Sequence, residues 1–218
     1  MRRRGRCYAE AMYAPAAFRE ERLPVLHEFI QENGFAAVVT SGPAGLTASH
    51  IPVDLDPAAG PYGILRGHLA RANPQWRELD GVRETLVIVQ GPHAYVSPSW
   101  YAAKREHGRV VPTWDYVAVH AWGKAQAFDD RERLRSVVES LTARHEGAKP
   151  APWRLDDAPA DYVEAMLGAI VGFEMTIERL EGSWKLSQNR SADDRRGVIE
   201  GLASGSALEQ AVARIIPR

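Results

Sequence analysis

The stretch GHLARANPQW, residues 67–76, decides how the rest of the chain is interpreted. It follows an apolar run at 63–65 that has the pattern of a β-strand. Just past this strand end it brings together an imidazole, a guanidinium and an amide, from His68, Arg71 and Asn73. Charge-assisted donors beside free backbone N–H groups suit an anion such as a phosphate. A structural interpretation is equally open at this point: Asn73 would cap a short helix, and Arg71 would pair with an acidic neighbour.

Four other segments share this mixture of hydrogen-bonding aromatic and small polar residues between short apolar runs. They are HIP at 50–52, GPHAYVSPSWY at 91–101, VPTWDYVAVHAWG at 111–123 and SWKLSQN at 183–189. A barrel with only a structural role does not need so many hydrogen-bonding aromatic residues near its strand ends. A planar, phosphorylated ligand would use them. The last segment stays open, because its polar residues suit a ligand or partner subunit and equally a turn before the final helix.

The composition is that of an ordinary globular protein, with 218 residues, 45% hydrophobic and 25% charged. A chain of this length buries a sizeable core without disulfides or structural metals. The net charge of −1 gives no overall electrostatic reason to expect nucleic acid as a partner. The single cysteine, Cys7, cannot form an internal disulfide and favours a reducing, cytoplasmic location. No apolar stretch approaches the roughly 20 residues of a membrane span, so no membrane partner is expected.

The order of the expected helices and strands predicts a mainly β protein with helices, of the α+β class. Strands are expected at 35–40, 46–55, 63–69, 85–89, 95–97 and, with breaks, 110–128, with a further strand at 172–182. Helices are expected at 18–33, 129–146, 160–170 and 193–216, the last with a break at 204–205. The spacing favours a meandering antiparallel barrel over alternating βα units.

Residues 12–218 are expected to form a single domain, since no linker, repeat or low-complexity tract interrupts them. The basic start MRRRGRCYAEA is not followed by an apolar stretch, which argues against a secretory signal. Because MYAPAAF from Met12 looks like a natural beginning, residues 1–11 are expected to be a disordered N-terminal extension. The alternative for this extension is a short ordered arm at a dimer interface.

Several common catalytic signatures are absent from the sequence. There is no GxSxG, no GxxxxGK[ST] and no GxGxxG after a strand, so acyl-transfer, P-loop and Rossmann chemistry lack support. His50, His68, His93 and His120 are scattered over the strand regions rather than set at metal-ligand spacing, so no metal is expected. DNA has little support as a partner, because the arginine-rich pieces at 2–6 and 190–196 are short.

The chain resembles the PaiB-type FMN-binding negative transcriptional regulators over residues 12–213. The resemblance rests on MYAPAAF, LTASHIPVDLD, GHLARANPQW, GPHAYVSPSWY, VPTWDYVAVHAWG, LTARHE, PW followed by DAP, and KLSQNRSADDRRGVI, in this order. It implies the FMN-binding split β-barrel with peripheral helices, a fold shared with pyridoxamine-phosphate oxidases and flavin reductases. It also implies a homodimer with FMN at the subunit interface.

By the same resemblance, backbone groups of Ser49, His50 and Ile51 would meet the edge of the isoalloxazine ring. His68, Arg71 and Asn73 would hold the ribityl phosphate. Trp114, with its neighbours to 116, and residues 96–100 are further candidates, and Lys185, Gln188 and Asn189 would come from the partner subunit. The chain departs from the family pattern at Asp115, where Asn is usual, and at Ser183, where Lys is usual. The Asp would weaken cofactor binding if it faced the phosphate, and would have no effect in solvent.

Three functions follow as expectations from this resemblance. The first is a cytoplasmic, homodimeric, FMN-binding negative regulator of transcription, with DNA as an open partner. The second is an FMN-dependent oxidoreductase of the split-barrel reductase or oxidase type, in which His50 or His68 could serve as proton donor. The third is an FMN-free dimer that acts through protein contacts.

Overall fold

A computed structural model describes residues 12–218, so the expected disordered extension at 1–11 lies outside the described residues. The chain divides into two compact units. The barrel unit comprises Arg22–Gly91 and Ala118–Leu180, and the terminal unit comprises the described residues 12–21, Pro92–Val117 and Glu181–Arg218. Three strands contribute residues to both units, and the expectation of one domain over 12–218 stays a prediction.

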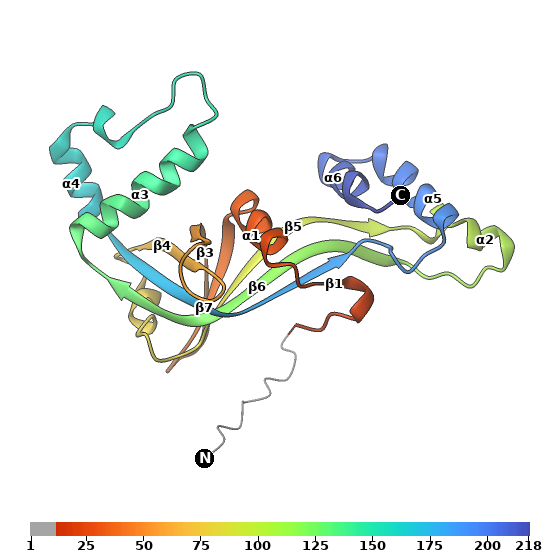
Figure 1. Cartoon of the computed structure of the whole chain (residues 1–218), viewed down its shortest axis with the longest axis horizontal. Coiled ribbons are helices and arrows are strands. Elements are labelled where there is room, and N and C mark those ends of the chain that lie inside the picture. Colours follow the sequence, from red (N-terminus) through yellow and green to blue (C-terminus); the bar gives the residue numbers. More distant parts are fainter. Residues whose placement is uncertain (1–11) are drawn as a thin grey trace, which may run out of the picture. The chain divides into compact units, whose positions relative to one another are not determined.

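Figure 1 labels the main helices and strands and colours them in sequence order. The elements of the barrel unit are given first, and the strands β5, β6 and β7 continue from it into the terminal unit. They are α1 (Leu23–Glu32), β2 (Phe35–Gly42), β3 (Gly45–Asp56), β4 (Ile64–Ala70), η2 (Pro74–Glu78), β5 (Thr85–Val96), β6 (Thr113–Phe128), α3 (Arg131–Glu146), η4 (Leu155–Asp157), α4 (Ala160–Gly168) and β7 (Ile170–Lys185). The terminal unit adds η1 (Ala16–Phe18), β1 (Arg19–Glu20), η3 (Pro98–Trp100), α2 (Ala102–Glu106), α5 (Ala192–Ala203) and α6 (Ala207–Ile215).

Six strands close into a barrel. The sheet order is β1-β7-β4-β3-β2-β5-β6, and β6 also pairs with β7, which joins the two ends of the β2–β7 set. Alternate residues point inward, so that Val38, Leu65, Val87 and Phe173 are fully buried. At Gly67 a Cβ atom would lie 2.8 Å from the Phe173 ring, so the interior needs glycine here. The expected mainly β architecture with helices is therefore confirmed.

Most expected element boundaries agree with the structure, with differences near β5, β6, α1 and α2. The run expected at 110–128 with breaks is one strand, Thr113–Phe128, and helix α2 was not expected. The strands expected at 85–89 and 95–97 are one continuous strand, because the fixed backbone angle of Pro92 is compatible with extended structure. The helix expected from residue 18 begins only at Leu23, because Arg19 and Glu20 form β1 and pair with β7. The break expected at 204–205 separates α5 from α6.

The short helix η2 places a buried glutamine between β2 and β3. The side-chain amide nitrogen of Gln75 lies 2.9 Å from the carbonyl oxygen of Val38, 3.1 Å from the Thr40 hydroxyl and 3.2 Å from the carbonyl oxygen of Thr47. Asn73 caps η2 by accepting from the Gln75 backbone N–H at 3.0 Å. The density of polar residues in GHLARANPQW is thus partly explained by the way η2 is fixed to the strands.

We expect Gln75→Ala to lower the free energy of unfolding by about 1–3 kcal/mol, because it leaves buried acceptors on β2 and β3 without their donor. Urea denaturation measures this change. The matched control is Gln126→Ala, which removes an exposed side chain and should cost no more than about 0.5 kcal/mol. Equal losses for the two variants would show that the Gln75 amide does not stabilise the barrel.

Candidate functional site

Strands β3 and β4 separate part of the way along β3. Pairing of β3 with β2 covers residues 45–52, whereas its pairing with β4 covers only Val53–Asp56, opposite Ile64–Gly67. Over residues 48–52 the edge of β3 that faces β4 therefore has no strand partner in the described chain. We call residues 48–52 the open edge. Unpaired backbone donors and acceptors of this kind can bind the polar rim of a planar ligand. Ser49, His50 and Ile51 all lie in this stretch, but only the backbone groups of His50 point to the open edge, because those of Ser49 and Ile51 pair with Val38 and Ala36 of β2.

Apolar residues remain exposed beside the open edge. The His50 ring stacks on the ring of Phe35, with a centroid distance of 6.4 Å and an interplanar angle of 28°. Phe35 is 67% exposed, and Leu46, two residues before the open edge, is 80% exposed. Exposed apolar side chains grouped around unpaired backbone indicate a surface that another molecule covers.

Helix α3 lies across the outer face of β3 and β4 and is held there by polar contacts. The buried carboxylate of Asp54 on β3 accepts from the Ser140 hydroxyl at 2.6 Å and from Arg144 Nε at 3.2 Å. Nearby, Arg66 on β4 pairs with Glu174 at 2.8 Å. Charge-assisted bonds to a buried carboxylate are among the stronger polar contacts in proteins, so α3 has a defined position on the sheet.

A hollow of about 320 Å³ lies between α3 and the strands, and we call it the inner hollow. Its lining residues are Pro52, His68, Val138, Leu141, Thr142, His145, Glu146 and Trp153. The Nδ1 atom of His68 is buried and has no hydrogen-bond partner among the described residues. Burial lowers the pKa of the His68 imidazole, so this ring is neutral at pH 7. A neutral imidazole with a vacant nitrogen can donate to, or accept from, a bound molecule.

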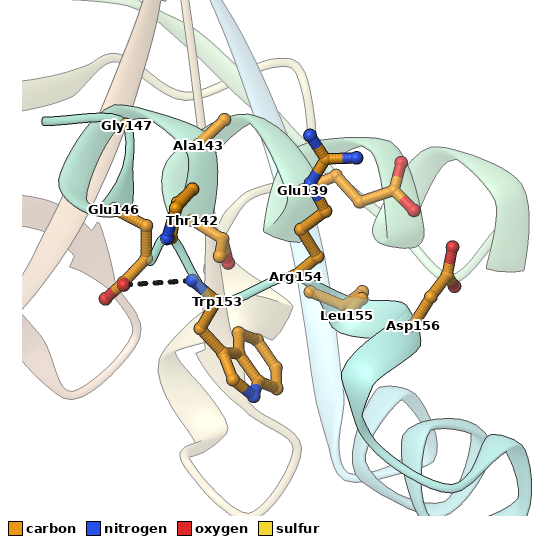
Figure 2. Close-up of a pocket in the computed structure, with 10 residues that line it drawn as sticks. Glu139, Thr142, Ala143, Glu146, Gly147, Trp153, Arg154, Leu155 and Asp156 are labelled. Atoms are coloured by element: carbon orange, nitrogen blue, oxygen red, sulfur yellow. Dashed lines mark hydrogen bonds between the residues drawn. The ribbon is translucent and has the colours of Figure 1, made fainter. Parts of the chain in front are cut away.

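A second hollow of about 470 Å³, the outer hollow, lies between α3 and the segment that returns after it. Figure 2 shows Glu139, Thr142, Ala143 and Glu146 of α3 on one side and the returning segment from Trp153 to Asp156 on the other. Thr142, Glu146 and Trp153 line both hollows. Trp153 was not among the residues expected at the site. The signal that could have found it is a tryptophan between proline and arginine in a loop.

The guanidinium of Arg71, expected at the phosphate, is bound within the chain. It donates to the carbonyl oxygens of Gly168 and Ile170, at 2.7 and 2.9 Å, and forms a two-pronged pair with Asp129. Asn73 donates to the hydroxyl of Ser49 at 2.8 Å. The structural alternative stated for Arg71 and Asn73 is therefore present, and their contact with a phosphate stays a prediction.

The remaining candidates, Trp114, Lys185 and Gln188, belong to the terminal unit. Trp114 is 54% exposed, and its ring packs against those of His93 and Tyr95, with centroid distances of 6.0 and 6.2 Å. Lys185 donates to the Thr113 hydroxyl at 2.6 Å, and the Gln188 side chain accepts from the backbone N–H of Leu186 at 2.7 Å. These three residues and the open edge lie in different units, and their roles toward a ligand stay predictions.

Asp115 does not face solvent, one of the two positions considered for it, and its polar contacts lie within the terminal unit. Its side chain is fully buried, and one carboxylate oxygen accepts from the Ser187 hydroxyl at 2.7 Å. The other oxygen has no hydrogen bond, although Lys185 Nζ lies 3.8 Å away. Burial raises the pKa of Asp115, opposed by the Ser187 hydrogen bond and by the charge of Lys185. This departure from the family pattern therefore acts on the interior of the terminal unit.

Two further findings concern other kinds of site. Within residues 12–218, no group of three or more His, Cys, Asp or Glu side chains is arranged to hold a metal ion. In the same part of the chain, no helix combines the length and the apolar character that crossing a membrane requires.

Comparison with known proteins places the chain in a family. Residues 12–179 match the family described as "Putative FMN-binding domain". The chain is 38% identical to the protease synthase and sporulation protein PAI 2 of Bacillus subtilis, over 88% of this chain and 89% of that protein. An uncharacterized protein of Aspergillus fumigatus is 34% identical, over 94% and 96% of the two chains.

Solved structures share the fold at low sequence identity. The FAD and heme binding protein of Mycobacterium smegmatis superposes with a TM-score of 0.56 at 16% identity, covering 85% of this chain and 79% of that one. A conserved hypothetical protein of Mycobacterium tuberculosis gives a TM-score of 0.55 at 13% identity, covering 83% and 94%. The expected split β-barrel with peripheral helices is confirmed.

We expect Asp115→Asn to stabilise the protein at pH 8 by about 1–2 kcal/mol, because it removes a buried carboxylate with an unpartnered oxygen. A pKa raised in the folded state means that folding favours the protonated form, so the carboxylate costs stability as pH rises through that pKa. The advantage of the variant should therefore shrink as pH falls toward the ordinary aspartate pKa. Urea midpoints between pH 4.5 and 8 measure it.

Asp193→Asn is the matched control, because that carboxylate is exposed on α5 and should show no such pH trend. A loss of stability in Asp115→Asn at pH 8 would mean that attraction to Lys185 outweighs the cost of burial.

Proposed function

The chain belongs to the PaiB-type family of FMN-binding proteins, and on this premise we propose that it is a homodimeric, FMN-dependent negative regulator of transcription. FMN is the cofactor that membership of this family gives the chain. The Bacillus subtilis relative is named a protease synthase and sporulation protein, and sporulation is a cellular programme rather than a chemical reaction. That name supports a regulatory role, and the resemblance described from the sequence supports repression.

The observation that carries the cofactor assignment is the open edge of β3 beside a half-buried histidine, His68, whose buried Nδ1 atom has no hydrogen bond. In our proposal the backbone groups of His50 bind the polar rim of the isoalloxazine ring, with Ser49 and Ile51 on either side of this contact. His68 meets the ring from the neighbouring strand through Nδ1. The backbone of His50 has no strand partner on this edge and His68 Nδ1 has no hydrogen bond, and a flavin provides donors and acceptors for both.

For the phosphate we propose Arg71 with Asn73, at the end of β4. The side chain of Arg71 keeps 39% of its surface exposed, and its four hydrogen bonds leave one of five N–H groups vacant. The carboxylate of Asp129 competes for the same guanidinium and repels a phosphate. Cofactor binding at this position therefore requires Arg71 to exchange Asp129, at least in part, for the phosphate.

We include a second subunit in the proposal because residues 48–52 pair with β2 on one side and have no strand partner on the other. Phe35 and Leu46 expose apolar surface next to it, which a second copy would bury. The flavin would then lie at the subunit interface, with Trp114, Lys185 and Gln188 contributed by the partner. DNA binding has no separate support in the geometry, and repression can equally act through protein contacts.

One observation favours a second candidate, an FMN-dependent oxidoreductase. The inner hollow is open to small molecules, and it includes a neutral imidazole at His68. FMN supplies a ring that accepts and returns hydride or single electrons. His68 could hold or deliver a proton beside it. Oxidation of NADH or NADPH by the FMN-loaded protein, lost in His68→Phe, would favour this candidate.

We expect Arg71→Ala to weaken FMN binding at least tenfold, because it removes the cation proposed for the phosphate. Asp129→Asn should tighten binding by about two- to fivefold, because it frees the guanidinium and removes a like charge. Quenching of flavin fluorescence measures both dissociation constants. If both variants bind FMN like the unmodified chain, Arg71 is only a structural link between β4 and the carbonyl groups at the end of α4.

We expect Leu46→Glu to disrupt the dimer and with it repression, because it places a charge on the apolar surface beside the open edge. Light scattering should give a dimer mass for the unmodified chain and a monomer mass for the variant. In cells that lack the gene, the transcripts that rise on deletion should fall again with the unmodified chain and not with Leu46→Glu.

Met166→Glu is the control for this experiment, because Met166 is 46% exposed and lies on helix α4 rather than on β2 or β3. It should remain dimeric and restore repression. A monomeric unmodified chain that still represses would contradict the proposed assembly, and unchanged transcripts on deletion would contradict the regulatory role.

A further inference from the structure

The indole of Trp153 forms a wall between the two hollows beside α3. It lines both the inner hollow, which contains His68, and the outer hollow of about 470 Å³. Trp153 is 46% exposed, although an indole is among the side chains that gain most from burial. Its backbone N–H donates to Glu146 at 3.2 Å, which fixes the segment against the end of α3. A half-exposed indole that lines a hollow is a surface on which an aromatic ring can stack.

The charges around the outer hollow leave one cation without a partner. Its three carboxylates are already in ion pairs, Glu139 with Arg135 at 2.9 Å, Asp156 with Arg135 at 2.5 Å and Glu146 with Lys149 at 2.5 Å. Arg154, by contrast, forms no ion pair with any residue of the described chain. The guanidinium that remains available therefore favours an anionic group on a ligand.

The shape of the outer hollow limits the ligand further. In Figure 2 the side chains of Trp153 and Arg154 point in opposite directions from the returning segment, so they mark two ends of the site. Between these ends the lining is mostly small or apolar, with Ala143, Pro152 and Leu155. A molecule that contacts both residues combines an aromatic face with an anionic group. The volume of about 470 Å³ is within the range of small-molecule sites.

We propose that the outer hollow is a second ligand site, which binds an aromatic carboxylate. The aromatic face stacks on Trp153 and packs against Ala143 and Leu155, and the carboxylate pairs with Arg154. Because Trp153 also lines the inner hollow, the ligand contacts the wall of the space beside His68. The proposal rests on the outer hollow alone and does not require the flavin to bind or to react.

The test is calorimetric titration of the full chain, with and without FMN, using 2-naphthoate and its neutral analogue 2-naphthamide as probes. We expect 2-naphthoate to bind at least tenfold more tightly than 2-naphthamide, because only the carboxylate pairs with Arg154. In Arg154→Gln this difference should disappear. Equal affinities of the unmodified chain for the two probes would overturn the proposal, as would no heat from 2-naphthoate at millimolar concentration.

Two further variants separate the outer hollow from general surface binding. Ala143→Phe fills the hollow from the exposed face of α3 and should abolish binding of 2-naphthoate. Arg77→Gln removes a different exposed guanidinium of the barrel unit, which lines neither hollow, and should leave binding unchanged. Loss of binding in Arg77→Gln, or full binding in Ala143→Phe, would place the probe elsewhere. FMN fluorescence of the same samples reports separately whether the cofactor site is intact.

Discussion

The carboxylate of Asp54 holds helix α3 on the outer face of β3, and both hollows depend on this contact. A carboxylate taken out of water is costly unless it is paired and hydrogen-bonded, and Ser140 and Arg144 provide both conditions. Near the start of α3, Leu134 packs with Leu155, Val163 and Leu167 in a small apolar cluster. The helix is therefore fixed by a polar contact on the sheet side and by apolar packing on the loop side. The distance of α3 from His68 and from Trp153 follows from these two constraints.

The elements of this fold were largely predictable because they depend on local patterns. The alternation of Phe173, Met175 and Ile177 indicates a half-buried strand, and Asp130 begins a helix as its position suggests. The hydrogen-bond partners of Arg71 could not be predicted in this way. Its acceptors on Gly168 and Ile170 are 97 and 99 residues away in the chain. A sequence shows that a cation follows a strand, but not which distant carbonyl groups the barrel brings to it.

The candidate site also has features that the sequence could predict and features that it could not. The family motif could point to Ser49 and His50 as neighbours on one strand, but it could not show that β4 leaves β3 beside them. The hollow at Trp153 could not, because it arises from the packing of a loop against a helix that precedes it. The sequence showed the two departures from the family pattern, but it could not show what surrounds these two side chains. Asp115 and Ser183 are both buried in the terminal unit, and each has a side-chain oxygen without a hydrogen bond. Their effect is expected on stability and pH response.

The segment between β6 and β7 contributes no strand to the barrel, yet every residue that lines the outer hollow comes from it. Of the inner hollow, only Pro52 and His68 belong to barrel strands. Substitutions between residues 129 and 169 can therefore change the shape and chemistry of both hollows, while the pairing of the barrel strands stays intact. In evolutionary terms the barrel is a constant platform, and this helical insertion is the part in which related proteins can diverge in ligand choice.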